Sequence, residues 1–197
     1  MSSTTPRRIA IIQGHPDSGG RHYCHALADA YAAGATAAGH EARVIDAGAL
    51  DFAILRSKEE YEHATPPEPI RAAQQTIVWA EHLVVVFPLW AGMLPALLKA
   101  FVEQAFRPGF AFTTAGHGRV QRLLTGRSAR IVVTMGMPAF AYRWLFGAHG
   151  VKALRSILWM CGIAPARATM IGNVESRAAG ARTRWLARMN ALGRSVR

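Results

Sequence analysis

The sequence predicts an α/β fold in which helices cover both faces of a five-stranded parallel sheet, giving three layers. The first observation is that short apolar segments alternate with amphipathic segments along the chain, as is typical of such folds. The second is the segment 82–87, whose interior reads Leu-Val-Val-Val and fits a central parallel strand buried on both faces. The length of 197 residues fits a single domain over residues 1–197.

Three strands and three helices are expected in the first half. Residues 8–13 form a short apolar strand that ends at Gly14, and residues 22–38 form a helix with Gly39 as its stop signal. A second strand at 41–45 is followed by a long connection over 47–68. Pro69 opens a helix at 69–81, and the strand at 82–87 leads through a loop into an apolar helix at 94–106.

The second half continues the alternation with two strands and two helices. Residues 107–128 are expected to be irregular, 130–134 form the fourth strand, and a loop and a helix lead to Cys161. The fifth strand covers 167–171 and the closing helix 183–192, while residues 1–7 are expected to be a flexible N-terminus. Ligands bind beyond the carboxyl ends of parallel strands, so we expect the chemistry in the loops after strands one, three and four.

Composition points to a cytoplasmic protein. No stretch reaches the roughly 18 consecutive apolar residues of a membrane helix, and no targeting segment is expected at the basic, polar N-terminus. Cys24 and Cys161 show neither a disulfide framework nor the spacing of metal ligands. We therefore expect two buried thiols in a reducing compartment, and no metal.

Charge is distributed unevenly. Residues 1–103 hold 8 Lys/Arg and 11 Asp/Glu, whereas residues 104–197 hold 15 Lys/Arg and a single acid, Glu175. A basic half can serve a nucleic acid, an anionic membrane or a phosphorylated ligand, or can reflect frequent arginine alone. No aromatic-plus-basic RNA motif or helix-turn-helix pattern is present, so no nucleic acid is expected.

The loop Gly14–His22 precedes a helix and suits a phosphate group. It lacks the glycine spacing of a dinucleotide-binding turn and the Lys-Ser/Thr ending of a P-loop. It does offer the Ser18 hydroxyl, two flexible glycines, Arg21 and His22 beside a helix N-terminus, which attracts anions. The alternative is an ordinary surface turn in which Asp17 or Ser18 acts as a local cap.

Two further loops carry unusual residues. In the loop 88–93, Trp90 would give a flat apolar wall for a planar ring, unless it packs in the core. After the fourth strand, Gly136 would allow close approach of a ligand edge. Tyr142 and His149 form a candidate pair of proton donors, although either residue could be structural.

With these loops the chain resembles the flavodoxin-like NAD(P)H:quinone oxidoreductases, which include DT-diaphorase-type enzymes, modulator-of-drug-activity proteins and ancillary oxidoreductases of potassium efflux systems. The resemblance covers roughly residues 8–172. It is carried by Gly14-His15-Pro16-Asp17-Ser18, Tyr23-Cys24-His25-Ala26-Leu27, Phe87-Pro88-Leu89-Trp90, Pro95-Ala96-Leu97-Leu98-Lys99, Pro108-Gly109-Phe110-Ala111-Phe112, Thr134-x-Gly136, Tyr142 and His149-Gly150.

The resemblance implies the strand order 2-1-3-4-5 and a flavin at the carboxyl edge of the sheet. FMN is expected, with FAD as the alternative, because the chain ends soon after its last helix. By matching position, residues near the flavin phosphate are His15, Ser18, Tyr23 and Cys24. Those along the ring are Pro88, Leu89, Trp90, Ala91 and Gly92, with Thr134 and Gly136 on its pyrimidine side. Tyr142 and His149 match a pair that helps the ring accept hydride.

The resemblance further implies a homodimer and a ping-pong reaction in which NAD(P)H reduces the flavin and a quinone or similar acceptor oxidises it. The basic second half favours NADPH. One rival interpretation is a flavin-bearing ancillary subunit of a potassium efflux system, with a membrane-protein partner and little turnover. A second rival is a nucleic-acid binder that has lost flavin.

Overall fold

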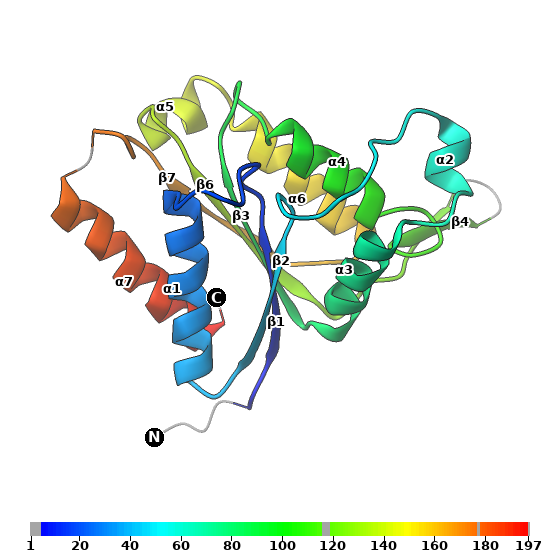
Figure 1. The fold of residues 1–197 in the computed structure, drawn as a ribbon, viewed down its shortest axis with the longest axis horizontal. Helices are drawn as coiled ribbons and strands as arrows, with labels where there is room; N and C mark the ends of the chain where they lie inside the picture. The colour runs from blue at the N-terminus through cyan, green and yellow to red at the C-terminus, as the bar shows by residue number, and fades with distance from the viewer. Residues whose placement is uncertain (1–4, 116–118, 177, 197) are drawn as a thin grey trace.

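The computed structural model describes residues 5–115, 119–176 and 178–196. Five parallel strands form one sheet in the order β2-β1-β3-β6-β7 (Figure 1). They are β1 (Arg8–Gln13), β2 (Glu41–Asp46), β3 (His82–Pro88), β6 (Ser128–Thr134) and β7 (Ala166–Ile171). Counted within this sheet alone, the strands follow the predicted order, and each predicted strand is present with its bounds shifted by two residues at most.

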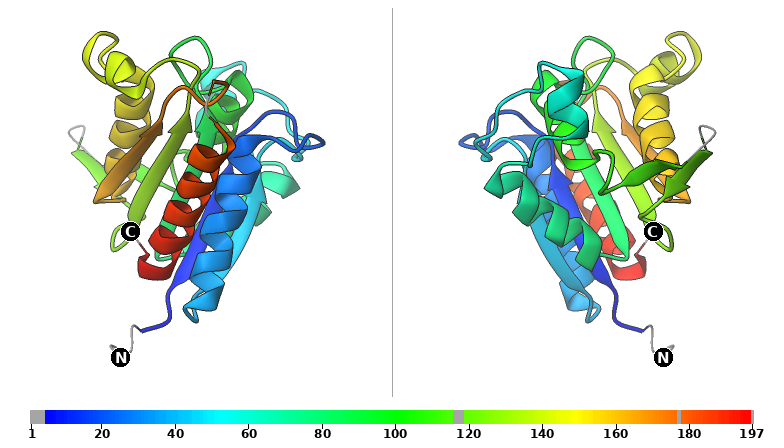
Figure 2. Two further views of the ribbon diagram at one scale, coloured as in Figure 1. Left: turned by 90° about the vertical axis from the view of Figure 1, so that its left-hand side faces the viewer. Right: turned by 90° about the vertical axis from the view of Figure 1, so that its right-hand side faces the viewer.

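Helices cover both faces of the sheet. Helices α1 (Tyr23–Ala37) and α7 (Ala179–Ser195) pack against each other over one face, as Figure 2 shows. The other face carries α3 (Glu68–Trp79), α4 (Ala96–Ala105) and α6 (His149–Cys161). Successive residues of a strand face opposite sides of the sheet. Ile9 and Ile11 therefore pack in the core under α1 and α7, whereas Ala10 and Ile12 pack in the core under α3, α4 and α6.

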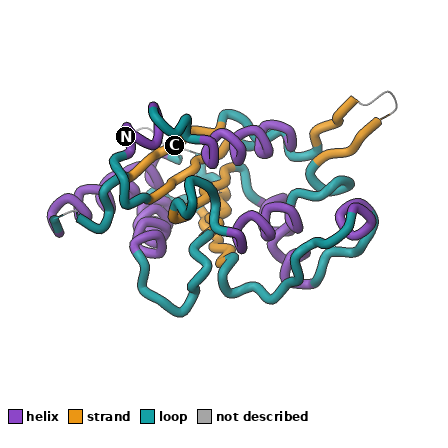
Figure 3. The backbone as a smooth tube through the Cα atoms, turned by 90° about the horizontal axis from the view of Figure 1, so that it is seen from above, coloured by secondary structure: helices purple, strands orange, loops and turns teal. Residues whose placement is uncertain are grey.

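The segment predicted as irregular, 107–128, and the long connection predicted over 47–68 both contain regular structure. Strands β4 (Phe112–Ala115) and β5 (Arg119–Arg122) form an antiparallel hairpin that projects at one end of the molecule in Figure 3; residues 116–118 lie outside the described residues. The four residues of β5 are all exposed, so the sequence here lacks the alternation of apolar and polar residues that predicts a strand. The short helix α2 (Lys58–Glu62) is capped by Ser57, whose Oγ accepts from the Glu60 N–H at 3.1 Å.

The predicted loop and helix between 135 and 161 form two helices, α5 (Ala139–Trp144) and α6. In Figure 1, α5 lies above the carboxyl ends of β6 and β7. No helix within the described ranges is long and apolar enough to cross a membrane.

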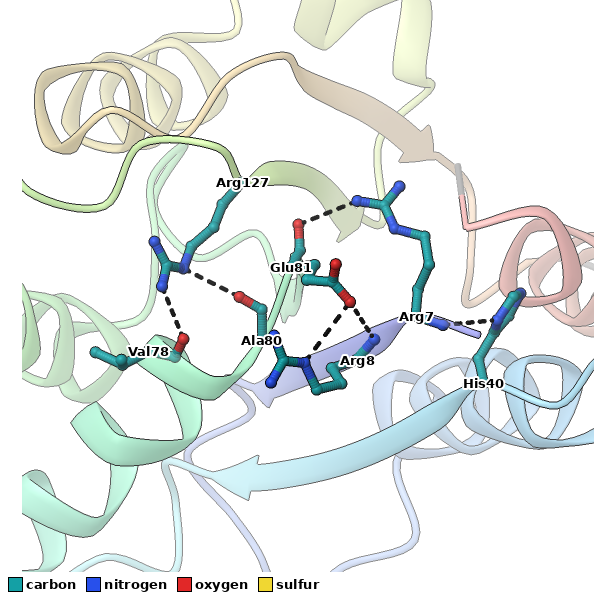
Figure 4. A network of polar contacts seen from close by, with 7 residues as sticks. All are labelled: Arg7, Arg8, His40, Val78, Ala80, Glu81 and Arg127. Atoms are coloured by element: carbon teal, nitrogen blue, oxygen red, sulfur yellow. Dashed lines mark hydrogen bonds and ion pairs between the residues drawn. The ribbon is translucent and has the colours of Figure 1, made fainter. Parts of the chain in front are cut away.

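The amino edge of the sheet is held by a polar network (Figure 4). Arg127 donates to the carbonyl oxygens of Val78 and Ala80 at 2.7 and 3.0 Å, where α3 ends. Arg7 is anchored, because its N–H donates to Nδ1 of His40 at 3.2 Å. Arg7 is the last residue of the N-terminus predicted to be flexible, and residues 1–4 lie outside the described part.

Candidate functional site

The loop after β1 turns around the carboxylate of Asp17. Its Oδ1 accepts from the backbone N–H groups of Gly19 and Gly20, each at 3.1 Å, and its Oδ2 lies 2.7 Å from Nε2 of His22. The hydrogen bond with His22 holds the pKa of Asp17 below its usual range. The sequence left two interpretations open, and the loop has the form of a turn capped by Asp17. The predicted Ser18 is exposed on this turn.

Three imidazole rings gather beside this turn. The rings of His15 and His22 are stacked, with centroids 3.7 Å apart and planes inclined by 15°, and the ring of His25 lies 5.7 Å from each. Both ring nitrogens of His25 are buried and have no hydrogen-bond partner within the described residues. Within the same residues, no group of three histidine, cysteine or acidic side chains could hold a metal ion.

His15 and the start of α1 together favour an anion. Burial, followed by repulsion from His22, lowers the pKa of His15 below its usual range. Nδ1 of His15 accepts from the Asp17 N–H at 3.1 Å, so the neutral ring carries its proton on Nε2 and can donate from there. In the part of the chain that the structure describes, no side chain caps α1. The first N–H groups and the dipole of a helix attract negative charge.

The loop after β3 is a tight turn that begins with a large ring. Trp90 and Met93 exchange backbone hydrogen bonds of 3.1 and 2.9 Å. Between them, Ala91 and Gly92 have φ of +47° and +76°, as in a type I′ turn. The Trp90 side chain is 50% exposed and meets the His15 ring edge-on, with centroids 6.0 Å apart. Trp90 is therefore not packed in the core, and part of its ring is accessible beside His15.

One contact joins this turn to β6, and a second joins β6 to α1. The Leu89 N–H, just after Pro88 at the end of β3, donates to the Thr134 carbonyl at 2.7 Å. The Thr134 hydroxyl lies 3.2 Å from Sγ of Cys24, and both side chains are buried. Burial raises the pKa of Cys24 to about 11, so this thiol is neutral. The structure thus brings Cys24 and Thr134, predicted on different parts of the ligand, into contact with each other.

The loop after β6 is open at Gly136. The nearest atoms that a Cβ built there would meet belong to the Glu175 carboxylate, the closest at 3.4 Å, and Gly136 itself is exposed. Glu175 was missed by sequence reasoning, although it is the single acid of the second half. Across the site, the predicted Tyr23 turns toward α7, where its hydroxyl donates to the Arg182 carbonyl at 3.3 Å.

Tyr142 and His149 are not hydrogen-bonded to each other within the described residues. The Tyr142 hydroxyl donates to the Gly92 carbonyl and accepts from the Gly150 N–H, both at 3.1 Å, and the side chain is 1% exposed. His149 is exposed at the first residue of α6, and its ring lies so close to Gly147 that a side chain on that glycine would approach Nε2 to 2.8 Å. The described residues therefore do not show the direct contact that a proton relay between Tyr142 and His149 would need.

Sequence reasoning noted His22 in the loop before α1, but it missed His25 and Glu175 as candidate residues of this site. His22 and His25 are three residues apart at the start of α1, a spacing that places two side chains on neighbouring positions of a helix surface. That spacing was the available signal. Nothing in the sequence indicated that His15 would stack on His22, because the stacking depends on how the Asp17 turn folds back.

Two curated relatives match part of the chain. The glutathione-regulated potassium-efflux system ancillary protein KefG of Yersinia enterocolitica is 42% identical over 102 residues, which are 46% of this chain and 52% of that protein. The FMN-dependent NADH:quinone oxidoreductase 2 of Listeria innocua is 35% identical over 92 residues, 47% of this chain and 43% of that protein. The chain thus spans about half the length of the curated relatives it matches.

The fold is matched along nearly the whole chain. The solved structure of an NAD(P)H:quinone oxidoreductase from Methanothermobacter marburgensis has a TM-score of 0.76 and 22% identity, over 98% of both chains. A family model described as the flavodoxin-like fold matches residues 7–192. The chain therefore belongs to the family of proteins with a flavodoxin-like fold.

Proposed function

We propose that this protein is a flavin-dependent NAD(P)H oxidoreductase that transfers hydride to quinones or similar small acceptors. The observation that carries the proposal is the exposed ring of Trp90 standing beside His15 and the uncapped start of α1 at the carboxyl edge of the sheet. A flat apolar wall next to an anion-binding helix end suits a planar ring that bears a phosphate. The names of the matched relatives point to the same chemistry.

The residues present fit FMN. Both nitrogens of His25 are buried without a partner in the described part of the chain, and a phosphate near the start of α1 would provide acceptor oxygens for them. We assign His15, Ser18, Tyr23 and Cys24 to the phosphate end, and add His22 and His25. For the ring we assign Pro88, Leu89, Trp90, Ala91 and Gly92, with Thr134 and Gly136 on the pyrimidine side.

When bound, the flavin would supply the redox chemistry by accepting hydride from NAD(P)H and returning it to the acceptor. The protein would position the ring against Trp90 and leave one face open to both substrates in turn. Tyr142 would hold the turn at Gly92 against α6 through its two hydrogen bonds. His149, exposed at the start of α6, would stabilise negative charge that develops on the reduced ring.

A homodimer in the cytoplasm is part of this proposal. A cavity of about 350 Å³ with a nearly all-apolar lining runs from Trp90 along α4 to Ile157 of α6. Leu145 and Phe146 are also more than half exposed near the same edge. Exposed apolar surface of this extent marks an interaction site, and a second copy would cover it.

The second candidate is a flavin-bearing ancillary subunit with little turnover. It is favoured by the 42% identity to the KefG protein over about half of the chain. Co-purification with a potassium efflux channel, together with a bound flavin that NADPH reduces but quinones fail to reoxidise, would favour this candidate over the enzyme.

The experiment that tests the proposed function is an anaerobic absorbance spectrum of the purified protein before and after NADPH is added. Bands near roughly 370 and 450 nm that bleach on addition are expected from flavin chemistry, and reoxidation by a quinone would complete the cycle. A colourless protein that takes up neither FMN nor FAD from excess would contradict the proposal.

A further inference from the structure

A second cleft lies on the flank of the sheet, away from Trp90. It has a volume of about 460 Å³ and is bounded by α5, the edge strand β7 and α7; Figure 1 shows these three elements next to one another. Its lining includes three aromatic and three basic side chains: Phe140, Trp144, Trp185, Arg130, Arg143 and Arg188. The volume falls within the roughly 300–1,000 Å³ of small-molecule sites.

The cleft is positively charged. No acidic side chain is among the described residues that line it, and Glu175, the single acid of the second half, lies over Gly136 instead. Arg130 is 7% exposed and donates to the Thr169 hydroxyl at 2.6 Å. Burial lowers the pKa of Arg130, and repulsion from Arg167 and Arg188 adds to this effect. An anion in the cleft would relieve the repulsion between these guanidinium groups.

The aromatic rings hold the arginines in place and leave ring surface free. Arg143 lies over Trp144 with its guanidinium carbon 5.3 Å from the ring centroid, and Arg188 lies over Trp185 at 5.1 Å. Trp144 is 75% and Phe140 is 68% exposed. Aromatic faces next to fixed guanidinium groups recognise a planar base that carries a phosphate.

The geometry points to a binding site for a phosphorylated nucleoside, with the base against Phe140 and Trp144 and the phosphate at Arg143 and Arg188. Two sources share this chemistry. One is the adenosine 2′-phosphate end of NADPH, which rests on the proposed function: α5 begins three residues after Gly136, so the dinucleotide would extend from the flavin ring across α5. The other is a free nucleotide.

The first test is calorimetric titration of the full chain with adenosine 2′,5′-bisphosphate and with adenosine. The bisphosphate should bind more tightly, and R143Q and R188Q should each weaken it about tenfold, as expected for the loss of a charge-assisted hydrogen bond. R155Q, which removes an exposed arginine on α6 outside the cleft, should leave binding unchanged. The proposal would be overturned if the bisphosphate and adenosine bound with equal affinity. It would also be overturned if R155Q weakened bisphosphate binding as much as R143Q and R188Q do.

Steady-state kinetics then separate the two sources. If the cleft holds the end of NADPH, R188Q raises KM for NADPH and leaves KM for NADH and kcat unchanged. If R188Q weakens bisphosphate binding while KM for NADPH stays constant, the cleft takes a free nucleotide. Absence of turnover with either dinucleotide would contradict the proposed function, whereas the calorimetric result would still decide the nucleotide site.

Discussion

At the scale of single residues, two buried tyrosine hydroxyls differ in their hydrogen bonds. The Tyr142 hydroxyl links Gly92 to Gly150, whereas the Tyr31 hydroxyl is buried without a partner within the described residues. Tyr142→Phe should lower the free energy of unfolding by about 1–3 kcal/mol, because it leaves the buried Gly150 N–H and the half-buried Gly92 carbonyl without this partner. Tyr31→Phe is the matched control and should be neutral or stabilising. Urea unfolding measures both, and an equal loss in the two variants would contradict this account.

The Asp17 carboxylate occupies two backbone N–H groups of the loop that is proposed to bind the flavin phosphate. Its negative charge would repel the phosphate, while its oxygens maintain the turn. Asp17→Asn keeps an acceptor oxygen and removes the charge, so it should tighten FMN binding, most clearly at low salt where charges are least screened. Fluorescence titration of the apoprotein with FMN measures the affinity. As a control, Asp29→Asn changes an exposed acid further along α1 and should leave the affinity for FMN unaltered. Weaker FMN binding by Asp17→Asn would refute the proposed phosphate position.

At the scale of elements, the turn between β3 and α4 depends on left-handed backbone at Gly92. Gly92 has φ +76° and Gly39, after α1, has φ +83°; a side chain would meet nothing within 4 Å at either position. Gly92→Ala and Gly39→Ala should therefore each cost about 1–2 kcal/mol of unfolding free energy through conformation alone. Gly92→Ala alone should also weaken FMN binding. Thermal unfolding and FMN titration of both variants check this, and weaker FMN binding by Gly39→Ala would show that the effect is not local.

The elements that the sequence predicted well are those with a buried face. β3 is buried from His82 to Phe87, so its apolar composition revealed both its type and its central position. β5 is exposed throughout, and α2 has no buried residue, so neither left a periodic signal. The division of 135–161 into α5 and α6 depends on Ala148, which takes a left-handed conformation that alanine rarely adopts.

The candidate site was predictable at the level of loops rather than of contacts. Strand order placed the loops after β1, β3 and β6 at one edge, and Trp90 and Gly136 are accessible there. The contact between Cys24 and Thr134 and the separate hydrogen-bonding of Tyr142 arise from side-chain packing across more than one element. Contacts between residues far apart in the sequence cannot be predicted from the pattern of neighbouring residues.

At the scale of the whole molecule, the two edges of the sheet carry different chemistry. The carboxyl edge holds the candidate site, whereas the amino edge holds basic groups around His82, the first residue of β3. His82 is 2% exposed, and its Nδ1 lies 2.8 Å from the Ser128 hydroxyl. The Tyr31 ring stacks on it with centroids 6.4 Å apart. Burial, followed by repulsion from Arg7, Arg130 and Arg167, lowers the pKa of His82 to about 3.

This buried histidine predicts how stability depends on pH. Above about pH 6.5, the usual pKa of histidine, His82 is neutral in both states and contributes nothing. As pH falls from about 6.5 toward about 3, the unfolded chain takes up a proton that the folded protein excludes, so the free energy of unfolding should fall by up to ~1.4 kcal/mol per pH unit. His82→Phe should flatten this slope in urea unfolding between pH 4 and 6.5. Ser128→Ala removes the hydrogen bond but keeps the imidazole, so it should lower stability and retain the slope; an unchanged slope in His82→Phe would exclude His82 as the source.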